Sequence, residues 1–184
     1  LHGSPRSHLI WDGDLILALQ TSTGLEICRW KNDQCTKWMQ IEKGIVGSYA
    51  RFKELNGQWY LAYFDETLGI LKMATMTSEG LKIETVDGDP FKTYRGMDIA
   101  IFRGLNGNPG ILYLDAWTLK LRMAQKTSSG WSSEVLPFDG ALGFYTQVLE
   151  ESDRRIRIAF HSFRTDHPDR RQSFENLMIA DINL

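Results

Sequence analysis

The chain has 184 residues, of which 42% are hydrophobic and 24% are charged, a balance typical of a globular protein with a buried core. Its formal net charge of −2 at pH 7 provides no electrostatic attraction for nucleic acid or an anionic membrane surface, so neither is expected as a partner. The longest apolar runs are only as long as strands, and we therefore expect no membrane span.

Short apolar runs separated by turn residues follow one another along the chain, and this pattern predicts strands. The first expected strand covers residues 8–11, and the first repeat continues with runs at 17–20 and 26–29. The second repeat is the clearest, with expected strands at 49–55, 59–64, 70–76 and 81–86. Because no segment has an apolar stripe with a period of 3.6 residues, we expect little helix.

A hairpin turn recurs four times between these apolar runs. The turns are Asp12-Gly13, Asn56-Gly57, Asn106-Gly107 and Ser152-Asp153, at offsets of 44, 50 and 46 residues. Residues 61–65 and 71–74 of the second repeat also match residues 111–115 and 121–124 of the third. A period of 40 to 50 residues with several short strands in each unit is typical of a β-propeller blade.

The sequence therefore predicts an all-β, propeller-like fold of about four blades, each an antiparallel four-stranded sheet. We expect one domain over residues 1–184, with repeats at about 8–44, 45–94, 95–141 and 142–184. The last repeat ends after its third strand, which would leave an exposed sheet edge. We expect residues 1–7, a second copy in a homo-oligomer, or a second chain to cover that edge, as in a larger or dimeric propeller.

The two cysteines, Cys28 and Cys35, flank a possible two-residue turn at Lys31-Asn32. That turn would place the two cysteines opposite each other on neighbouring strands, within reach of a disulfide. Two reduced thiols in a cytosolic protein are the alternative. A disulfide would indicate a secreted or periplasmic protein.

Strand direction alternates within a blade, so the loops after each second strand and before each first strand share one face. We expect a binding site on this face. Gln20, Asp65 and Asp115 follow second strands, and we interpret His161 as the replacement of this Asp in the fourth repeat. Three further candidates, each two residues after a glycine, are Tyr49, Asp98 and Tyr145. Such convergent polar and aromatic groups are typical of a ligand site. Alternatively, the aspartates cap turns.

The segment at residues 162–172 is the longest loop after any second strand, and it is dense in charge. Arg164 in this loop could bind an anion and His167 could act as a base, although a solvated insertion is the simpler interpretation. Trp117 follows Asp115 in its loop and could stack on a sugar ring or pack against the protein. We predict no metal and no cofactor, because no ligand spacing or phosphate-binding loop is present.

Two turns resemble the Asp-box of sialidase-type propellers, whose pattern is Ser-x-Asp-x-Gly-x-x-Trp. They are Thr77-Ser78-Glu79-Gly80 and Thr127-Ser128-Ser129-Gly130, the second followed by Trp131. Both lack the box aspartate, and the tryptophan comes too early. The resemblance implies a propeller architecture. It does not imply sialidase activity, because the sialidase arginine triad cannot be placed on this chain.

Our functional prediction is a non-catalytic binding or scaffold module that recognises a glycan or a protein partner through one face of the propeller. The alternative is a carbohydrate-active enzyme, a glycoside hydrolase or lyase, with its acid and base on the same face. Carboxylate geometry distinguishes the two. Two carboxyls about 5 to 9 Å apart in an open cleft would favour hydrolysis, whereas carboxyls that cap turns would favour binding.

Overall fold

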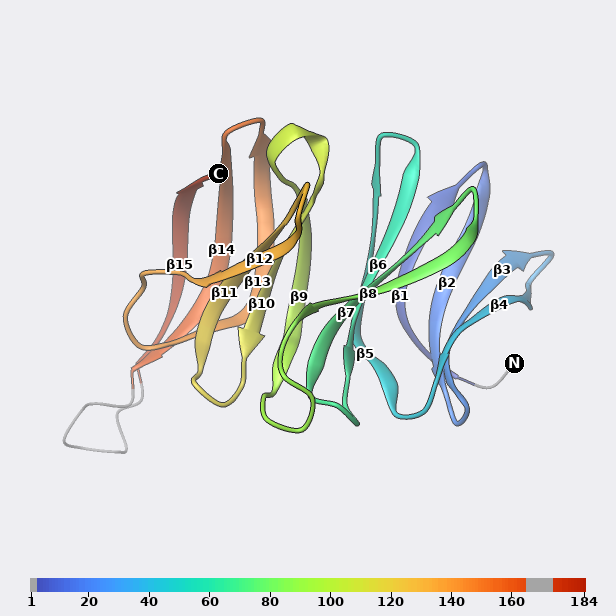
Figure 1. Ribbon diagram of the computed structural model, residues 1–184, viewed down its shortest axis with the longest axis horizontal. Coiled ribbons are helices and arrows are strands. Elements are labelled where there is room, and N and C mark those ends of the chain that lie inside the picture. Colours follow the sequence, from blue (N-terminus) through green and yellow to red (C-terminus); the bar gives the residue numbers. More distant parts are fainter. Residues whose placement is uncertain (1–2, 165–173) are drawn as a thin grey trace. The chain divides into compact units, whose positions relative to one another are not determined.

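The computed structural model describes residues 3–164 and 174–184, and these residues form strands joined by short turns (Figure 1). Within this described part, the one helical element is a single 3-10 turn at Leu105–Gly107. The chain divides into two compact units, Leu1–Gly96 and Met97–Leu184. The prediction of a single domain over the whole chain stays a prediction.

The strands form four separate sheets, in which neighbours in sequence are also neighbours in the sheet. Every pairing with a described register is antiparallel. The first sheet contains β1 (Ser4–Trp11), β2 (Asp14–Thr21), β3 (Gly24–Lys31) and β4 (Gln34–Lys43). The second contains β5 (Val46–Leu55), β6 (Gln58–Asp65), β7 (Ile70–Thr77) and β8 (Gly80–Asp87).

The third sheet contains β9 (Arg95–Arg103), β10 (Pro109–Asp115), β11 (Lys120–Thr127) and β12 (Gly130–Val135). The fourth has three strands, β13 (Ala141–Ser152), β14 (Arg155–Arg164) and β15 (Phe174–Asn183). The predicted all-β, propeller-like fold is therefore confirmed, and the strands expected in the second repeat are present with slightly wider bounds. The first strand is longer than expected because β1 pairs with β2 from Ser4 onward.

Each unit has its own apolar core. In the first unit, Ile16, Leu25 and Ile27 of the first sheet pack with Trp59 and Leu61 of the second. In the second unit, the corresponding cluster joins the third and fourth sheets and includes Phe102, Leu112, Leu121, Ile158 and Phe160. Alternate residues of a strand point to opposite faces of its sheet, so one face of each sheet supplies the side chains for the neighbouring sheet.

One close contact between successive sheets occurs three times. A glycine at the start of a first strand lies against the leucine that is second in the third strand of the preceding sheet. A Cβ atom on Gly47 would lie 2.9 Å from Leu25 Cδ1, one on Gly96 would lie 3.1 Å from Leu71 Cβ, and one on Gly143 would lie 3.2 Å from Leu121 Cδ1. All three leucines are 0% exposed. The sheets can approach this closely only because the residue above the leucine has no side chain.

We predict that Gly47→Ala destabilises the chain by about 2 kcal/mol more than Gly44→Ala, because the added methyl group overpacks the contact with Leu25. Gly44 is a matched control, because it has φ +109° against +103° for Gly47 and no atom within 4 Å of an added Cβ. Both variants share the cost of a left-handed backbone, about 1 to 2 kcal/mol. Urea unfolding of the two variants measures the difference, and equal losses would contradict the role of the close contact.

The threonine turns share one hydrogen-bonding arrangement. Thr77 Oγ1 donates to the Gly80 carbonyl and Thr127 Oγ1 to the Gly130 carbonyl, at 3.0 and 2.9 Å. The turn between β2 and β3 repeats it, with Thr21 Oγ1 3.1 Å from the Gly24 carbonyl oxygen. A threonine hydroxyl therefore closes these turns without a box aspartate, and the Asp-box likeness stays a resemblance.

Cys28 and Cys35 form the predicted disulfide, with their Cα atoms 5.6 Å apart. The turn differs from the expected one by one residue, because Lys31 pairs with Gln34 and Trp30 lies opposite Cys35. The turn residues are Asn32 and Asp33, with φ values of 51° and 58°. Asparagine and aspartate adopt this left-handed conformation more readily than lysine does, so Lys31 stays in the strand.

Within the described residues, no helix is long and apolar enough to cross a membrane.

Candidate functional site

The residue two places after each close-packed glycine has a left-handed backbone. The φ values are 55° at Tyr49, 47° at Asp98 and 55° at Tyr145. Tyr49 and Tyr145 lie within shifts of the pairing register, between Ser48 and Arg51 of β5 and between Phe144 and Gln147 of β13, which mark a β-bulge in each strand. A bulge bends its strand and changes the direction of a side chain. The three residues that share a place in the sequence repeat therefore also share an unusual, left-handed backbone conformation.

Asp65 and Asp115 both cap the turns that follow their strands. Asp65 Oδ1 accepts the Leu68 backbone N–H at 2.9 Å, and Asp115 Oδ1 accepts the N–H groups of Trp117 and Thr118 at 3.1 and 3.2 Å. Each aspartate is only 2% exposed. These hydrogen bonds give both carboxylates a structural role, in accordance with the turn-cap alternative.

His161 does not stand at the position of those aspartates, so our interpretation of it as their replacement is wrong. His161 pairs with Phe144, as Phe64 pairs with Ser48 in the second sheet. The aspartate position belongs to Ser162, which pairs with Leu142 as Asp65 pairs with Val46. The fourth repeat differs in length from the second before this strand. A match of four residues therefore did not fix the register of His161.

The remaining candidates differ in how accessible they are. Tyr145 is 67% exposed and its ring lies 5.4 Å from that of His161, edge to face. Trp117 is 64% exposed in the turn between β10 and β11. Both rings therefore present surface that a sugar or a peptide could cover. Arg164 is the last residue of β14, and His167 lies outside the described residues.

A polar cluster in the first unit contains Gln20, which the sequence places on the predicted binding face, and three residues that were not predicted to bind. Gln20 Nε2 donates to Glu66 Oε1 at 3.0 Å, and Ser48 Oγ donates to the same oxygen. Arg6 Nε donates to Gln20 Oε1 at 3.0 Å. These residues, together called the Glu66 cluster, come from the start of β1, the end of β2, the start of β5 and the turn after β6. Ser48 precedes Tyr49 in the chain and could have been found from its place after Gly47.

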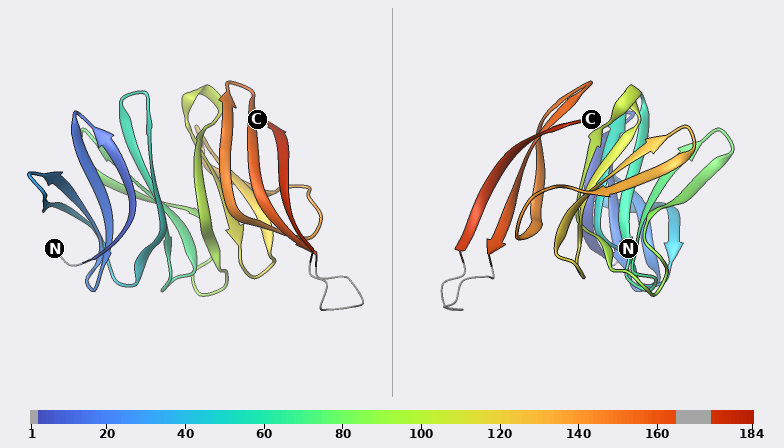
Figure 2. Two further views of the ribbon diagram at one scale, coloured as in Figure 1. Left: turned by 180° about the vertical axis from the view of Figure 1, so that it is seen from behind. Right: turned by 60° about the vertical axis from the view of Figure 1, so that its left-hand side comes forward.

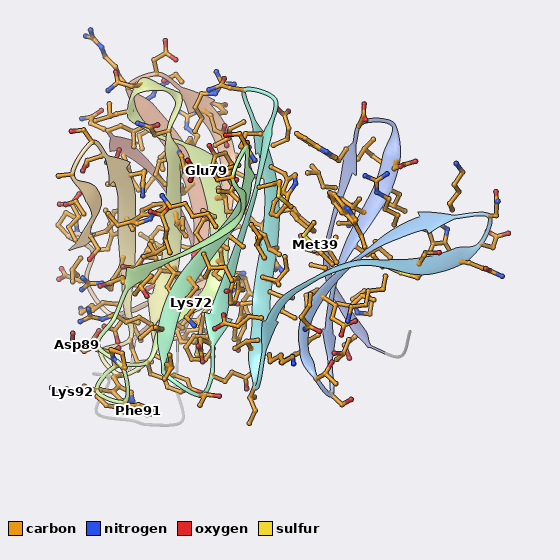
Figure 3. All side chains as sticks on the ribbon, turned by 45° about the vertical axis from the view of Figure 1, so that its right-hand side comes forward. Met39, Lys72, Glu79, Asp89, Phe91 and Lys92 are labelled. Carbon is orange, nitrogen blue, oxygen red and sulfur yellow. A yellow bond between two sulfur atoms is a disulfide. The ribbon has the colours of Figure 1, made fainter. Side chains whose placement is uncertain are left out.

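A second cluster in the first unit is a buried charge network. Lys72 Nζ lies 2.7 Å from Asp65 Oδ2 and 2.6 Å from Glu42 Oε1, and Figure 3 labels Lys72 on β7. Tyr63 donates its hydroxyl to Glu42 Oε2 at 2.6 Å. Burial lowers the pKa of Lys72, but the two carboxylates outweigh this effect and the pKa is raised above its ordinary value. Burial, with Glu42 nearby, raises the pKa of Tyr63 as well. The lysine therefore stays charged and the phenol stays neutral, which indicates a structural network.

We predict that Lys72→Met destabilises the chain by roughly 3 kcal/mol, because Asp65 would be left as a buried carboxylate without its cation. Lys72→Arg should lose less than half of that, since arginine keeps the charge. Met178 and Arg122 occupy the equivalent positions in the fourth and third sheets, each opposite an aromatic residue as Lys72 is opposite Tyr63. Both side chains therefore suit this position sterically. Chemical denaturation provides the measurement, and equal stability of the two variants would contradict the network's importance.

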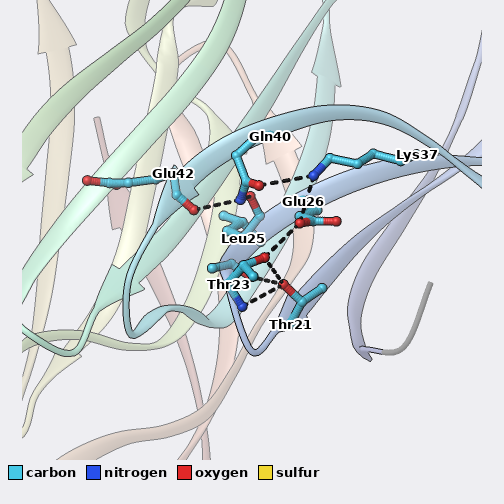
Figure 4. Close-up of polar contacts among 8 residues, drawn as sticks. Thr21, Thr23, Leu25, Glu26, Lys37, Gln40 and Glu42 are labelled. Carbon is cyan, nitrogen blue, oxygen red and sulfur yellow. Dashed lines mark hydrogen bonds and ion pairs between the residues drawn. The ribbon is translucent and has the colours of Figure 1, made fainter.

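Glu26 is a third buried polar residue, located on β3 (Figure 4). It is 3% exposed, and its Oε1 accepts hydrogen bonds from Lys37 Nζ at 2.8 Å and Thr23 Oγ1 at 2.9 Å. Its other oxygen, Oε2, is buried and has no hydrogen-bond partner among the described residues. The hydrogen bond from Lys37 lowers the pKa of Glu26 against the opposing effect of burial.

We predict that this lowered pKa makes the first sheet sensitive to acid. A carboxyl whose pKa is lower in the folded state stabilises the fold above its ordinary pKa of 4.5, and this contribution is lost as the pH falls. Wild type should therefore lose stability relative to Glu26→Gln between about pH 5 and pH 3. Lys37→Met should remove most of that difference. Thermal unfolding at several pH values measures it, and an unchanged acid response in Lys37→Met would count against the hydrogen bond as its cause.

A groove of about 620 Å³ is present in the second unit, between the turn at Leu105–Gly107 and the strands β11 and β12. Neutral hydrogen-bonding side chains predominate in its lining, among them Asn106, Asn108, Gln125 and Ser132. The buried Gln125 Oε1 has no hydrogen-bond partner among the described residues. Sequence reasoning missed this groove because its residues come from two strands and two turns that are separated along the chain.

The comparisons with known proteins support the fold. No family model matches this chain, and no curated protein matches it. Among solved structures, the chain is similar to Bacteroides ovatus Xyloglucan PUL GH43B, with a TM-score of 0.55 and 12% sequence identity. The match covers 95% of this chain and 39% of that protein, so the chain spans well under half of its length. At this identity the likeness concerns the fold alone.

Proposed function

We propose that this chain is a carbohydrate-binding module of the propeller type that recognises a glycan without cleaving it. The single observation that carries the non-catalytic proposal is the geometry of Asp65 and Asp115. Both carboxylates are buried and committed to turn N–H groups, and Asp65 is also paired with Lys72. General acid–base catalysis needs carboxyls that can reach a substrate and exchange a proton with it.

The proposed contact surface in the first unit is Tyr49 with the Glu66 cluster. Carboxylate, amide, hydroxyl and guanidinium groups offer the donors and acceptors that sugar hydroxyls require, and an aromatic ring complements the apolar face of a sugar. In the second unit we propose six residues as contacts: Asp98, Trp117, Tyr145, His161, Arg164 and His167. The proposal of a glycan, rather than a protein, is supported by the solved structure whose name refers to xyloglucan.

The disulfide and the proposed glycan ligand agree with a secreted or periplasmic protein, where disulfides persist. The alternative function, a glycoside hydrolase or lyase, would need another pair of carboxyls. Activity measurements separate the two functions.

We predict that wild-type protein binds xyloglucan oligosaccharides and that Glu66→Gln together with Ser48→Ala weakens this binding by about tenfold or more. The expected loss follows from removing one charged and one neutral hydrogen-bonding group from the ligand surface. Isothermal titration calorimetry measures binding, and a reducing-sugar assay with the same oligosaccharides tests for hydrolysis.

Gln125→Ala is the matched control, because it removes one polar side chain from the groove of the second unit and leaves the Glu66 cluster intact. It should bind like wild type. Loss of binding in Gln125→Ala alone would place the glycan in the groove and contradict the Glu66 cluster as its site. Hydrolysis by wild type would overturn the non-catalytic proposal in favour of the enzyme.

A further inference from the structure

Two of the recurring hairpin turns have the same three residues and the same backbone conformation. Leu55-Asn56-Gly57 lies between β5 and β6, and Leu105-Asn106-Gly107 lies between β9 and β10. Figure 2 shows the hairpin of β5 and β6 in turquoise. The φ values are 55° at Asn56 and 58° at Asn106, and those of the following glycines are 75° and 74°. The second turn is therefore a natural control for the first.

The residue three places before the glycine distinguishes the two turns. Gly57 N–H donates a hydrogen bond to the side-chain oxygen Glu54 Oε1 at 2.6 Å. Gly107 N–H donates to the backbone carbonyl oxygen of Gly104 at 3.2 Å, and this glycine supplies no carboxylate. A carboxylate within hydrogen-bond distance of a proton can act as a general base, whereas a carbonyl oxygen cannot keep that proton. The Asn56 turn therefore holds a base on its own backbone N–H.

An asparagine followed by a glycine can react with its own backbone, because glycine has no side chain to hinder the approach of its nitrogen to the asparagine side chain. The nucleophile here is Gly57 N, and the electrophile is Asn56 Cγ. Among the described residues, none lies within 4 Å of a Cβ atom built on Gly57. Glu54, Asn56 and Gly57 are all exposed, so water reaches the turn. The turn therefore brings together a nucleophile, an electrophile, a base and solvent.

We propose that Asn56 is a site of spontaneous deamidation assisted by Glu54. Glu54 takes the proton of Gly57 N as this nitrogen forms a bond to Asn56 Cγ, and the product is a five-membered cyclic imide. The bond between Asn56 Cγ and Nδ2 breaks, and the Nδ2 group leaves as ammonia with the proton that Glu54 had accepted. Water then opens the imide at one of its two carbonyl groups, which gives aspartate or isoaspartate. This inference goes beyond the proposed glycan binding and does not depend on it.

The modification changes the hairpin of β5 and β6 in two ways. Both products place a second carboxylate near that of Glu54. Isoaspartate also adds a methylene group to the backbone of a two-residue turn, and the length of that turn fixes how the two strands pair. Leu55 and Trp59, on either side of the turn, are only 3% and 1% exposed. A change in this turn therefore acts directly on buried residues of the first unit.

Peptide mapping by mass spectrometry, during incubation of the folded protein at neutral pH, measures both asparagines in one sample. Asn56 should be converted about tenfold faster than Asn106, or more, because general base catalysis acts on Asn56 alone. In urea the two rates should become equal, since the unfolded chain keeps the shared Leu-Asn-Gly sequence but not the contact with Glu54. Equal rates in the folded protein would overturn the proposal, and so would a difference that persists unchanged in urea.

Glu54→Gln tests whether the carboxylate is the base. The amide oxygen of glutamine can still accept the hydrogen bond from Gly57, but it cannot take the proton. Conversion of Asn56 should therefore slow by about tenfold or more, and conversion of Asn106 should not change. The matched control is Glu79→Gln, which removes the same charge from an exposed glutamate in the turn between β7 and β8 (Figure 3). This control should convert Asn56 as wild type does. Conversion of Asn56 that is unchanged or faster in Glu54→Gln would overturn the proposal, as would equal slowing in both variants.

Discussion

The contact between a glycine and a leucine is the constraint on which the packing of this chain depends. Two sheets pack closely only if side chains from both fill the space between them, and the backbones can approach most closely where one residue has no Cβ atom. Gly47, Gly96 and Gly143 provide that point in three successive repeats. Two residues after each of these glycines, at Tyr49, Asp98 and Tyr145, the backbone is left-handed. The candidate site therefore lies next to the tightest contact of each repeat.

The residue that follows this leucine differs in charge among the four repeats, although its place in the sheet is the same. The four repeats have Glu26, Lys72, Arg122 and Met178 there. Lys72 shows what the position does, since it joins Asp65 of its own sheet to Glu42 of the preceding one. A buried ion pair adds little net stability compared with an apolar pair, but a mismatched one is strongly penalised. The effect of a charge at this position on stability therefore depends on the groups that face it.

The turns explain why acidic residues in this chain are poor evidence for catalysis. A turn of four residues between two strands leaves backbone N–H groups that need acceptors, and an aspartate at the end of the strand is the nearest one. Asp65 and Asp115 satisfy this need, and their burial follows from it. The Glu66 cluster and the exposed rings of Tyr145 and Trp117 therefore carry the binding proposal.

The sequence by itself determined the architecture: the strand-length apolar runs, the period near 50 residues and the glycine before each first strand predict the sheets and their order. It also predicted the disulfide, because two cysteines seven residues apart in a hairpin lie within reach of each other. Only the tertiary structure decided the function of particular side chains. His161 proved to be in the register of Phe64, with Ser162 at the aspartate position, since pairing partners and not short sequence matches fix a register. The Glu66 cluster could not be assembled from the sequence, because its residues come from four segments of the chain. A single sequence shows spacing along the chain but not distance across a sheet.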